Sequence, residues 1–102
     1  MKKDHAQEIE LRLLIVLREL EAQSSASSSY SPGELSFTDE MRQLSEYVKV
    51  AGEYEIAYES IVATLSAHLF VLTGPAAVAL LEAGLLLGYK TSRKEDALFD
   101  RR

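Results

Sequence analysis

A repeating apolar pattern near the N-terminus constrains this chain more than any other feature. Between residues 4 and 22, apolar side chains recur at spacings of four, three and four residues, at Ile9, Leu13, Val16 and Leu20. Because an α-helix has 3.6 residues per turn, this spacing places the four side chains on one face. That face is widened by Leu11, Leu14 and Leu17. The pattern predicts a central helix over residues 4–22, with Asp4 as its N-cap, that packs against two neighbours.

A second helix is predicted to begin after Ser36 or Thr38 and to stop at Gly52. Asp39 and Glu40 fall in its first turn, where negative side chains complement the helix dipole. Its core-facing residues are expected to be Phe37, Met41, Leu44, Val48 and Ala51. The opposite face is expected to be solvated, with ion pairs among Asp39, Arg42, Glu46 and Lys49.

A third helix is predicted over residues 53–72 and a fourth over residues 75–87, and Thr73-Gly74-Pro75 separates them. The buried side of the third helix is expected to be Tyr54, Tyr58, Ile61, Leu65 and Leu72. The fourth helix has small residues that permit close approach to its neighbours, Ala76, Ala77, Ala79, Ala83 and Gly84. We therefore expect the fourth helix to be the most buried.

The remaining segments are predicted to be a loop and a tail. Residues 23–36 contain serine runs and Pro32-Gly33, which disfavour regular structure and predict a flexible loop, either functional or a tolerated insertion. The tail, residues 89–102, holds five basic and three acidic residues, with Leu98 and Phe99 as its apolar anchors. Together the segments predict an all-α fold, a single domain built as a compact bundle of about four main helices.

Composition narrows the class of protein. The chain has 102 residues, of which 47% are hydrophobic and 26% charged, as expected of a globular domain. Cysteine is absent, and the polar N-terminus carries no export signal, so we expect a cytoplasmic protein. The most apolar stretch, residues 61–88, is interrupted by Thr73-Gly74-Pro75 and carries His68 and Glu82. It is therefore expected to form protein core and not to enter a membrane.

No catalytic or metal-binding motif is evident. His5 and His68 are far apart, and neither has a second histidine at helical spacing, so we expect no metal site and no cofactor. His68 is expected to be a partly buried structural residue. Glu55 and Glu59 stand one helical turn apart and suit three roles: a solvated face, a partner-binding acidic face, or acid–base catalysis. We expect the chain not to be an enzyme.

The charge distribution disfavours nucleic acid as a partner. The net charge of −5 divides into −3 for residues 1–52, −4 for residues 53–88 and +2 for the tail. Nucleic-acid binding requires a basic surface, and the predicted fourth helix has no basic residue with which to contact DNA.

Two short stretches resemble a known family. Residues 52–61 read GEYEIAYESI and residues 81–88 read LEAGLLLG. They resemble the small helical immunity proteins of bacterial contact-dependent growth inhibition and Maf-type polymorphic toxin systems. In that family a helix opens with Gly-Glu-aromatic and continues through Ala-x-Glu, and a later helix ends with two glycines four residues apart. The resemblance covers residues 38–89, about half the chain, while the serine loop and the tail depart from the family pattern.

The resemblance implies a cytosolic antidote that binds the C-terminal toxin domain delivered by a neighbouring cell, often a nuclease. The residues it implies for partner binding are Glu53, Glu55, Tyr58 and Glu59, with Asp39 and Glu46 as second choices. Tyr30, in the serine loop, is a further candidate as an exposed anchor. The oligomeric state stays open.

Two alternatives to an immunity protein remain. A small acidic secretion chaperone or regulatory adaptor would dimerise through an apolar face and bind an unfolded client. A small enzyme would need a concave pocket that holds at least two carboxylates or His68.

Overall fold

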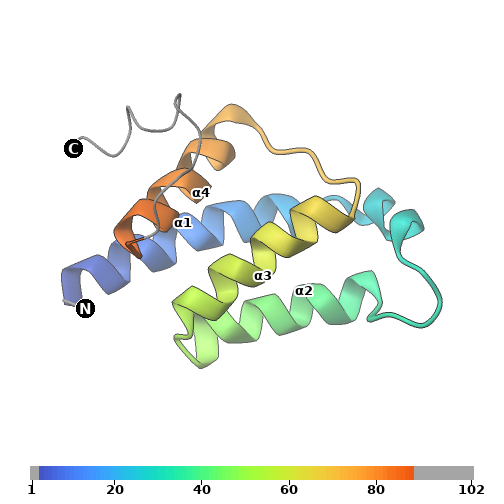
Figure 1. Ribbon diagram of the computed structural model, residues 1–102, viewed down its shortest axis with the longest axis horizontal. Coiled ribbons are helices and arrows are strands. Elements are labelled where there is room, and N and C mark those ends of the chain that lie inside the picture. The colour runs from blue at the N-terminus through green and yellow to red at the C-terminus, as the bar shows by residue number, and fades with distance from the viewer. Residues whose placement is uncertain (1–2, 89–102) are drawn as a thin grey trace.

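The computed structural model describes residues 3–88, and within them every regular element is helical (Figure 1). The α-helices are α1 (Lys3–Glu21), α2 (Phe37–Ser45), α3 (Tyr54–Ala67) and α4 (Gly74–Leu86). A 3₁₀-helix, η1 (Ser24–Ser29), follows α1, and a π-helical segment, η2 (Glu46–Val50), follows α2 directly. The predicted all-α bundle is confirmed. The predicted tail lies outside the described residues.

The central position predicted for the first helix is confirmed. α1 contacts α2, η2, α3 and α4, and Figure 1 shows α4 lying along it. The four side chains of its apolar stripe, Ile9, Leu13, Val16 and Leu20, have no solvent exposure. Burying an aliphatic side chain of this size stabilises a fold by about 1.5–3 kcal/mol. Leu17 also belongs to the core, whereas Leu11 is 58% exposed. Asp4 lies inside α1 and not at its predicted N-cap, because the helix begins at Lys3.

The second helix begins where the sequence indicates. The Ser36 side chain is the N-cap and accepts a hydrogen bond from the Asp39 backbone N–H at 3.1 Å. Met41, Leu44 and Val48 are buried, as predicted. Ala51 is exposed, which contradicts its predicted core position, because the wider π-helical turn of η2 changes the register before it. Gly52 then reverses the chain with a φ of 64°, a conformation that favours glycine.

The third helix ends at Ala67, five residues before the predicted end. His68 is extended, and side chains then alternate: Phe70 and Leu72 pack on the core, whereas Leu69 and Val71 are 75% and 73% exposed. Gln23, which follows the end of α1, binds this extended backbone. The Gln23 side-chain amide accepts a hydrogen bond from the Val71 N–H at 2.9 Å and donates one to the Val71 C=O at 2.6 Å. Such tertiary bonds replace the helical ones that the periodicity predicts.

The fourth helix starts at the predicted proline turn, where the Thr73 hydroxyl oxygen accepts from the Ala76 N–H at 3.4 Å. Its buried residues are the small ones, Ala76, Ala79, Ala83 and Gly84. Val78 is 47% exposed, and Leu81 and Leu85 are only half-buried. The prediction that this helix is the most buried is wrong, because α4 uses one small-residue face for packing while α1 is contacted from several sides.

The serine-rich connection is more regular than predicted. Residues 24–29 form η1, in which Ala26 is only 2% exposed. Serine hydroxyls donate to backbone carbonyls three residues earlier, from Ser28 to Ser25 at 3.1 Å and from Ser29 to Ala26 at 2.7 Å. The serines thus supply local hydrogen bonds that support the tight turns of a 3₁₀-helix.

Candidate partner-binding surface

The outer side of α3 combines carboxylates with exposed apolar side chains. Glu55 and Glu59 are exposed and stand one turn apart. Beside them, Ile56 is 45% and Val62 is 37% exposed. We call these four residues the α3 face. Acidic groups next to apolar ones suit a protein partner with a basic surface, because charge favours encounter and apolar contacts stabilise the complex.

The ion pairs of the described arginines involve carboxylates of α1, α2 and α4. The Arg12 guanidinium pairs with Glu8 and, at 2.9 Å, with Glu82, and these partners raise the pKa of Arg12. Arg42 pairs with Asp39 at 2.7 Å. Arg18 and Glu21 of α1 line a small hollow together with Lys49 of η2. Residues 50–88 contain no lysine or arginine, so α3 and α4 carry acidic side chains and no basic ones.

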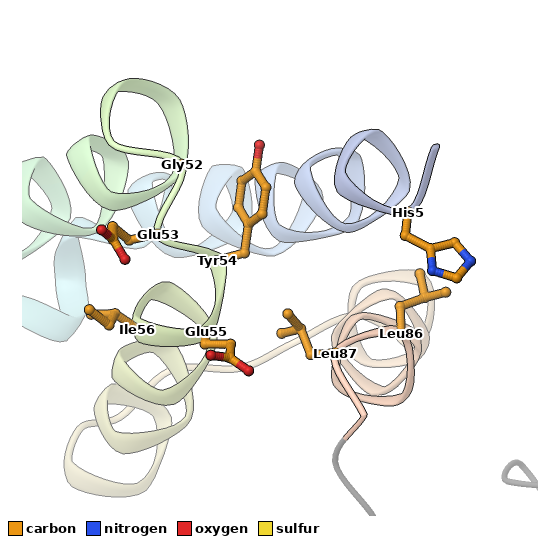
Figure 2. Close-up of a pocket in the computed structure, with 8 residues that line it drawn as sticks. All are labelled: His5, Gly52, Glu53, Tyr54, Glu55, Ile56, Leu86 and Leu87. Atoms are coloured by element: carbon orange, nitrogen blue, oxygen red, sulfur yellow. The ribbon is translucent and has the colours of Figure 1, made fainter. Parts of the chain in front are cut away.

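A pocket of about 610 Å³ opens at the start of α3, where three helices meet (Figure 2). It is lined by His5, Gly52, Glu53, Tyr54, Glu55, Ile56, Leu86 and Leu87. Figure 2 shows Glu53 and Glu55 on the α3 side, and Leu86 and His5 at the opposite end. Leu87 lies between the two ends. The pocket therefore has acidic groups at one end and an apolar wall contributed by α4.

The predicted site residues do not form one cluster. Glu55 and Glu59 stand one turn apart on α3, whereas the side chain of Glu53, the N-cap, points to the other side of the helix start from Glu55 (Figure 2). Asp39 lies at the opposite end of α2 from this site and is paired with Arg42. Glu46 is exposed at the start of η2. The structure thus places Glu55 and Glu59 on one face of α3 and separates Glu53 and Asp39 from them.

Tyr58, a predicted partner-binding residue, packs between two helices of the bundle. Its ring is half-buried between α3 and α4, and its hydroxyl lies against Gly84. Burial raises the pKa of Tyr58.

Tyr54, which was predicted only as a core residue, lines the pocket and donates a hydrogen bond to Glu10 at 2.6 Å. That hydrogen bond is the main cause of the raised Tyr54 pKa.

Tyr30 is not the exposed anchor that the sequence suggests. Its ring stacks on His68 with centroids 3.6 Å apart and planes 3° from parallel, and its hydroxyl donates to Glu40. The Phe37 ring contacts the Tyr30 ring edge-on, with 6.1 Å between the two ring centroids. Burial, followed by the Glu40 hydrogen bond, raises the pKa of Tyr30. Because the serine segment folds back onto the end of α3, the tyrosine becomes an intramolecular contact. The half-buried His68 has the structural role predicted for it.

The pocket meets the minimum requirement of the enzyme alternative, since it holds two carboxylates. Both glutamates are exposed, however, whereas enzymes tune a catalytic carboxyl group by burying it. Neither His68 nor Glu59 lines the pocket.

Two other features, a metal centre and a membrane-spanning helix, are absent from the residues that the structure describes. No group of three or more histidine, aspartate or glutamate side chains there is placed to hold a metal ion. Within residues 3–88, no helix has the length and apolar character needed to cross a membrane. Comparisons of the chain with protein-family models, with curated proteins and with solved structures find no match.

Proposed function

We propose that this chain is an immunity protein that binds and neutralises the toxin domain of a contact-dependent inhibition system, and that the toxin is a nuclease. The observation that carries the proposal is the α3 face, where exposed Glu55 and Glu59 adjoin exposed Ile56 and Val62. In this proposal the protein acts in the cytoplasm by binding alone, without catalysis, cofactor or metal.

Charge is the first support. A nuclease holds its substrate in a basic groove, and an acidic protein surface can occupy that groove in place of phosphates. Opposite potentials raise association rates from about 10⁵–10⁶ M⁻¹s⁻¹ toward 10⁸–10⁹ M⁻¹s⁻¹ at low salt. Residues 50–88 contain no lysine or arginine, so α3 and α4 themselves add no charge that would repel a basic groove.

The apolar neighbours are the second support. Long-range charge chiefly accelerates encounter, whereas desolvated anchors determine how slowly a complex dissociates. Ile56 and Val62 are exposed beside the glutamates and are available as such anchors. The family resemblance is a third support, since residues 52–61, which carry its first motif, include the start of α3 and five of the eight residues that line the pocket.

The direct test is co-expression with the C-terminal domain of the large exported protein encoded beside this chain. We expect the domain alone to kill the cells, and expect this protein to restore growth and to co-purify with the domain. A charge-reversed double variant, Glu55→Lys with Glu59→Lys, should lose much of the rescue. The proposal is wrong if the domain is toxic by itself and the native chain neither rescues growth nor co-purifies with it.

A small acidic secretion chaperone or regulatory adaptor is the alternative, and one observation favours it. Leu69 and Val71, 75% and 73% exposed, present apolar surface on the connection between α3 and α4, as an adaptor that binds an unfolded client would. Light scattering after size exclusion distinguishes the two functions. A dimer that dissociates when Leu69 and Val71 are changed to serine would favour the adaptor.

A further inference from the structure

The sequence of the tail, residues 89–102, complements the α3 face in charge and in apolar character. The tail has a net charge of +2, whereas residues 53–88 have a net charge of −4. Residues 98–102 read LFDRR, an apolar pair followed by an aspartate and two arginines. The α3 face likewise combines two apolar side chains with two charged ones, and its charges are of the opposite sign.

The end of α4 places the start of the tail close to the α3 face. Leu86 and Leu87 line the same pocket as Glu55 and Ile56, two residues of that face (Figure 2). The LFDRR stretch begins ten residues after Gly88. A chain of that length spans up to about 33–36 Å when extended. The α3 face extends over only about 10 Å of helix, at about 1.5 Å per residue. The tail is therefore long enough to reach the whole face.

Other exposed apolar side chains of the described residues match the tail less well. Leu11 is 58% exposed, but the neighbouring Glu8 is paired with Arg12 and Glu10 accepts a hydrogen bond from Tyr54.

The exposed Leu69 and Val71 belong to residues 60–81, a stretch without an acidic side chain. Glu19, which reaches the end of this connection from α1, is bonded to Thr73. The α3 face is therefore the better match for a segment that is both apolar and basic.

Covalent attachment makes even weak docking effective. A short connection that can span two sites gives an effective concentration in the millimolar range. A docking equilibrium with a dissociation constant below about 1 mM therefore keeps the face occupied most of the time. Arginine suits such a contact, because its guanidinium forms paired hydrogen bonds with carboxylates.

We propose that residues 98–102 dock on the α3 face of their own chain, with Leu98 and Phe99 against its apolar side chains and the two arginines at its glutamates. The docked tail occupies the surface that a partner needs, so the partner has to displace it. A tail docked nine-tenths of the time lowers the apparent affinity for the partner about tenfold. This regulatory consequence rests on the proposed function, whereas docking itself is tested without a partner.

The test is paramagnetic relaxation enhancement, measured by NMR on the full chain labelled with ¹⁵N. Because the chain has no cysteine, Ala97→Cys supplies a single attachment point for a nitroxide label beside Leu98. We expect the label to broaden the backbone amides of residues 55–62 more strongly than those of η1, which lies beyond the other end of α3 (Figure 1). In a mixture of spin-labelled chains with ¹⁵N chains that carry no spin label, we expect no broadening. Broadening in that mixture would assign the docking to a second copy and overturn the proposal.

Three double variants in the tail complete the test. Leu98→Ser with Phe99→Ser should lower the enhancement at residues 55–62 at least about threefold, because the apolar burial is lost. Arg101→Gln with Arg102→Gln should lower it at least about twofold, because the charge-assisted hydrogen bonds are lost. The matched control, Arg93→Gln with Lys94→Gln, removes the same charge from the tail outside the LFDRR stretch and should change the enhancement little.

Three results would overturn the proposal: equal enhancement in the native and serine variants, equal losses in the two charge variants, or broadening centred outside the α3 face. Rescue of growth in co-expression without docking would reject the tail and keep the immunity function. Docking without rescue would keep the tail contact and reject the immunity function.

Discussion

The Tyr58 hydroxyl oxygen lies 2.6 Å from the position that a Cβ atom on Gly84 would occupy. Tyr58 belongs to α3 and Gly84 to α4, so the missing side chain of the glycine accommodates the tyrosine ring where the two helices meet. Gly84 is also the first glycine of the pair in the second motif of the family resemblance. The motif thus has a packing role in this fold.

Gly84→Ala should destabilise the protein by about 1–3 kcal/mol, the usual cost of overpacking, even though alanine gains about 1 kcal/mol in helix propensity. Urea denaturation measures the change. In a Tyr58→Leu background the obstructing hydroxyl is absent, so the same substitution should cost less or become stabilising. Equal effects in the two backgrounds would show that the contact with Tyr58 does not limit residue 84.

Thr73 links the end of α1 to the start of α4. Its hydroxyl donates to Glu19 and accepts from the Ala76 N–H, and its backbone N–H donates to Glu19 at 3.0 Å. Thr73→Ala should lower the free energy of unfolding by about 0.5–2 kcal/mol through loss of the N-cap. Thr73→Ser retains the hydroxyl and should lie within about 0.5 kcal/mol of the native protein. If both variants are equally destabilised, the hydroxyl is not the cause.

Glu19 should make this link dependent on pH. The hydrogen bonds from Thr73 hold the pKa of Glu19 below its ordinary value of 4.5. A carboxyl group whose pKa is lowered by folding stabilises the fold above its unfolded pKa, and that stability is lost as pH falls through the folded pKa. Glu19→Gln should therefore be less stable than the native protein at pH 7, and the difference should shrink below about pH 4.5. A difference that stays constant between pH 7 and pH 3 would contradict the assignment.

Tyr30 should hold the serine-rich segment against the end of α3. Tyr30→Phe removes only the hydrogen bond to Glu40 and should cost about 0.5–1.5 kcal/mol. Tyr30→Ala also removes the stack on His68 and should cost more, by at least about 0.5–1.5 kcal/mol. Hydrogen exchange at the Ala26 and Tyr30 amides, which are bonded within the segment, should accelerate in the alanine variant. Unchanged exchange would mean that the stack does not hold η1 in place.

Helix identity was predictable because the apolar spacing in this chain is strong. The stripe from Ile9 to Leu20 and the capping signals at Ser36 and Pro75 act locally, and each appears where expected. The end of α3 was not predictable in the same way. Residues 68–72 continue an apolar pattern, but Gln23, distant in sequence, binds the backbone of Val71 and favours an extended chain.

The candidate site was predictable only in part. Charge and spacing place Glu55 and Glu59 on one side of a helix without any knowledge of the fold. The pocket needs the approach of α1 and α4 to the start of α3, so His5, Leu86 and Leu87 carry no sequence signal that marks them as neighbours. Tyr30 failed as an exposed anchor for a similar reason, since its position depends on the long-range stack with His68.

The most direct test of the central claim is the association rate of this protein with the neighbouring toxin domain, measured by stopped-flow fluorescence at low salt. Glu55→Lys with Glu59→Lys should slow association by about tenfold or more, while circular dichroism shows an intact helical fold. The matched reversal Glu21→Lys with Glu34→Lys should change the rate much less, because those residues lie outside the α3 face. Equal slowing in both variants would indicate a response to net charge alone. An unchanged rate in the α3 variant would show that the toxin binds elsewhere.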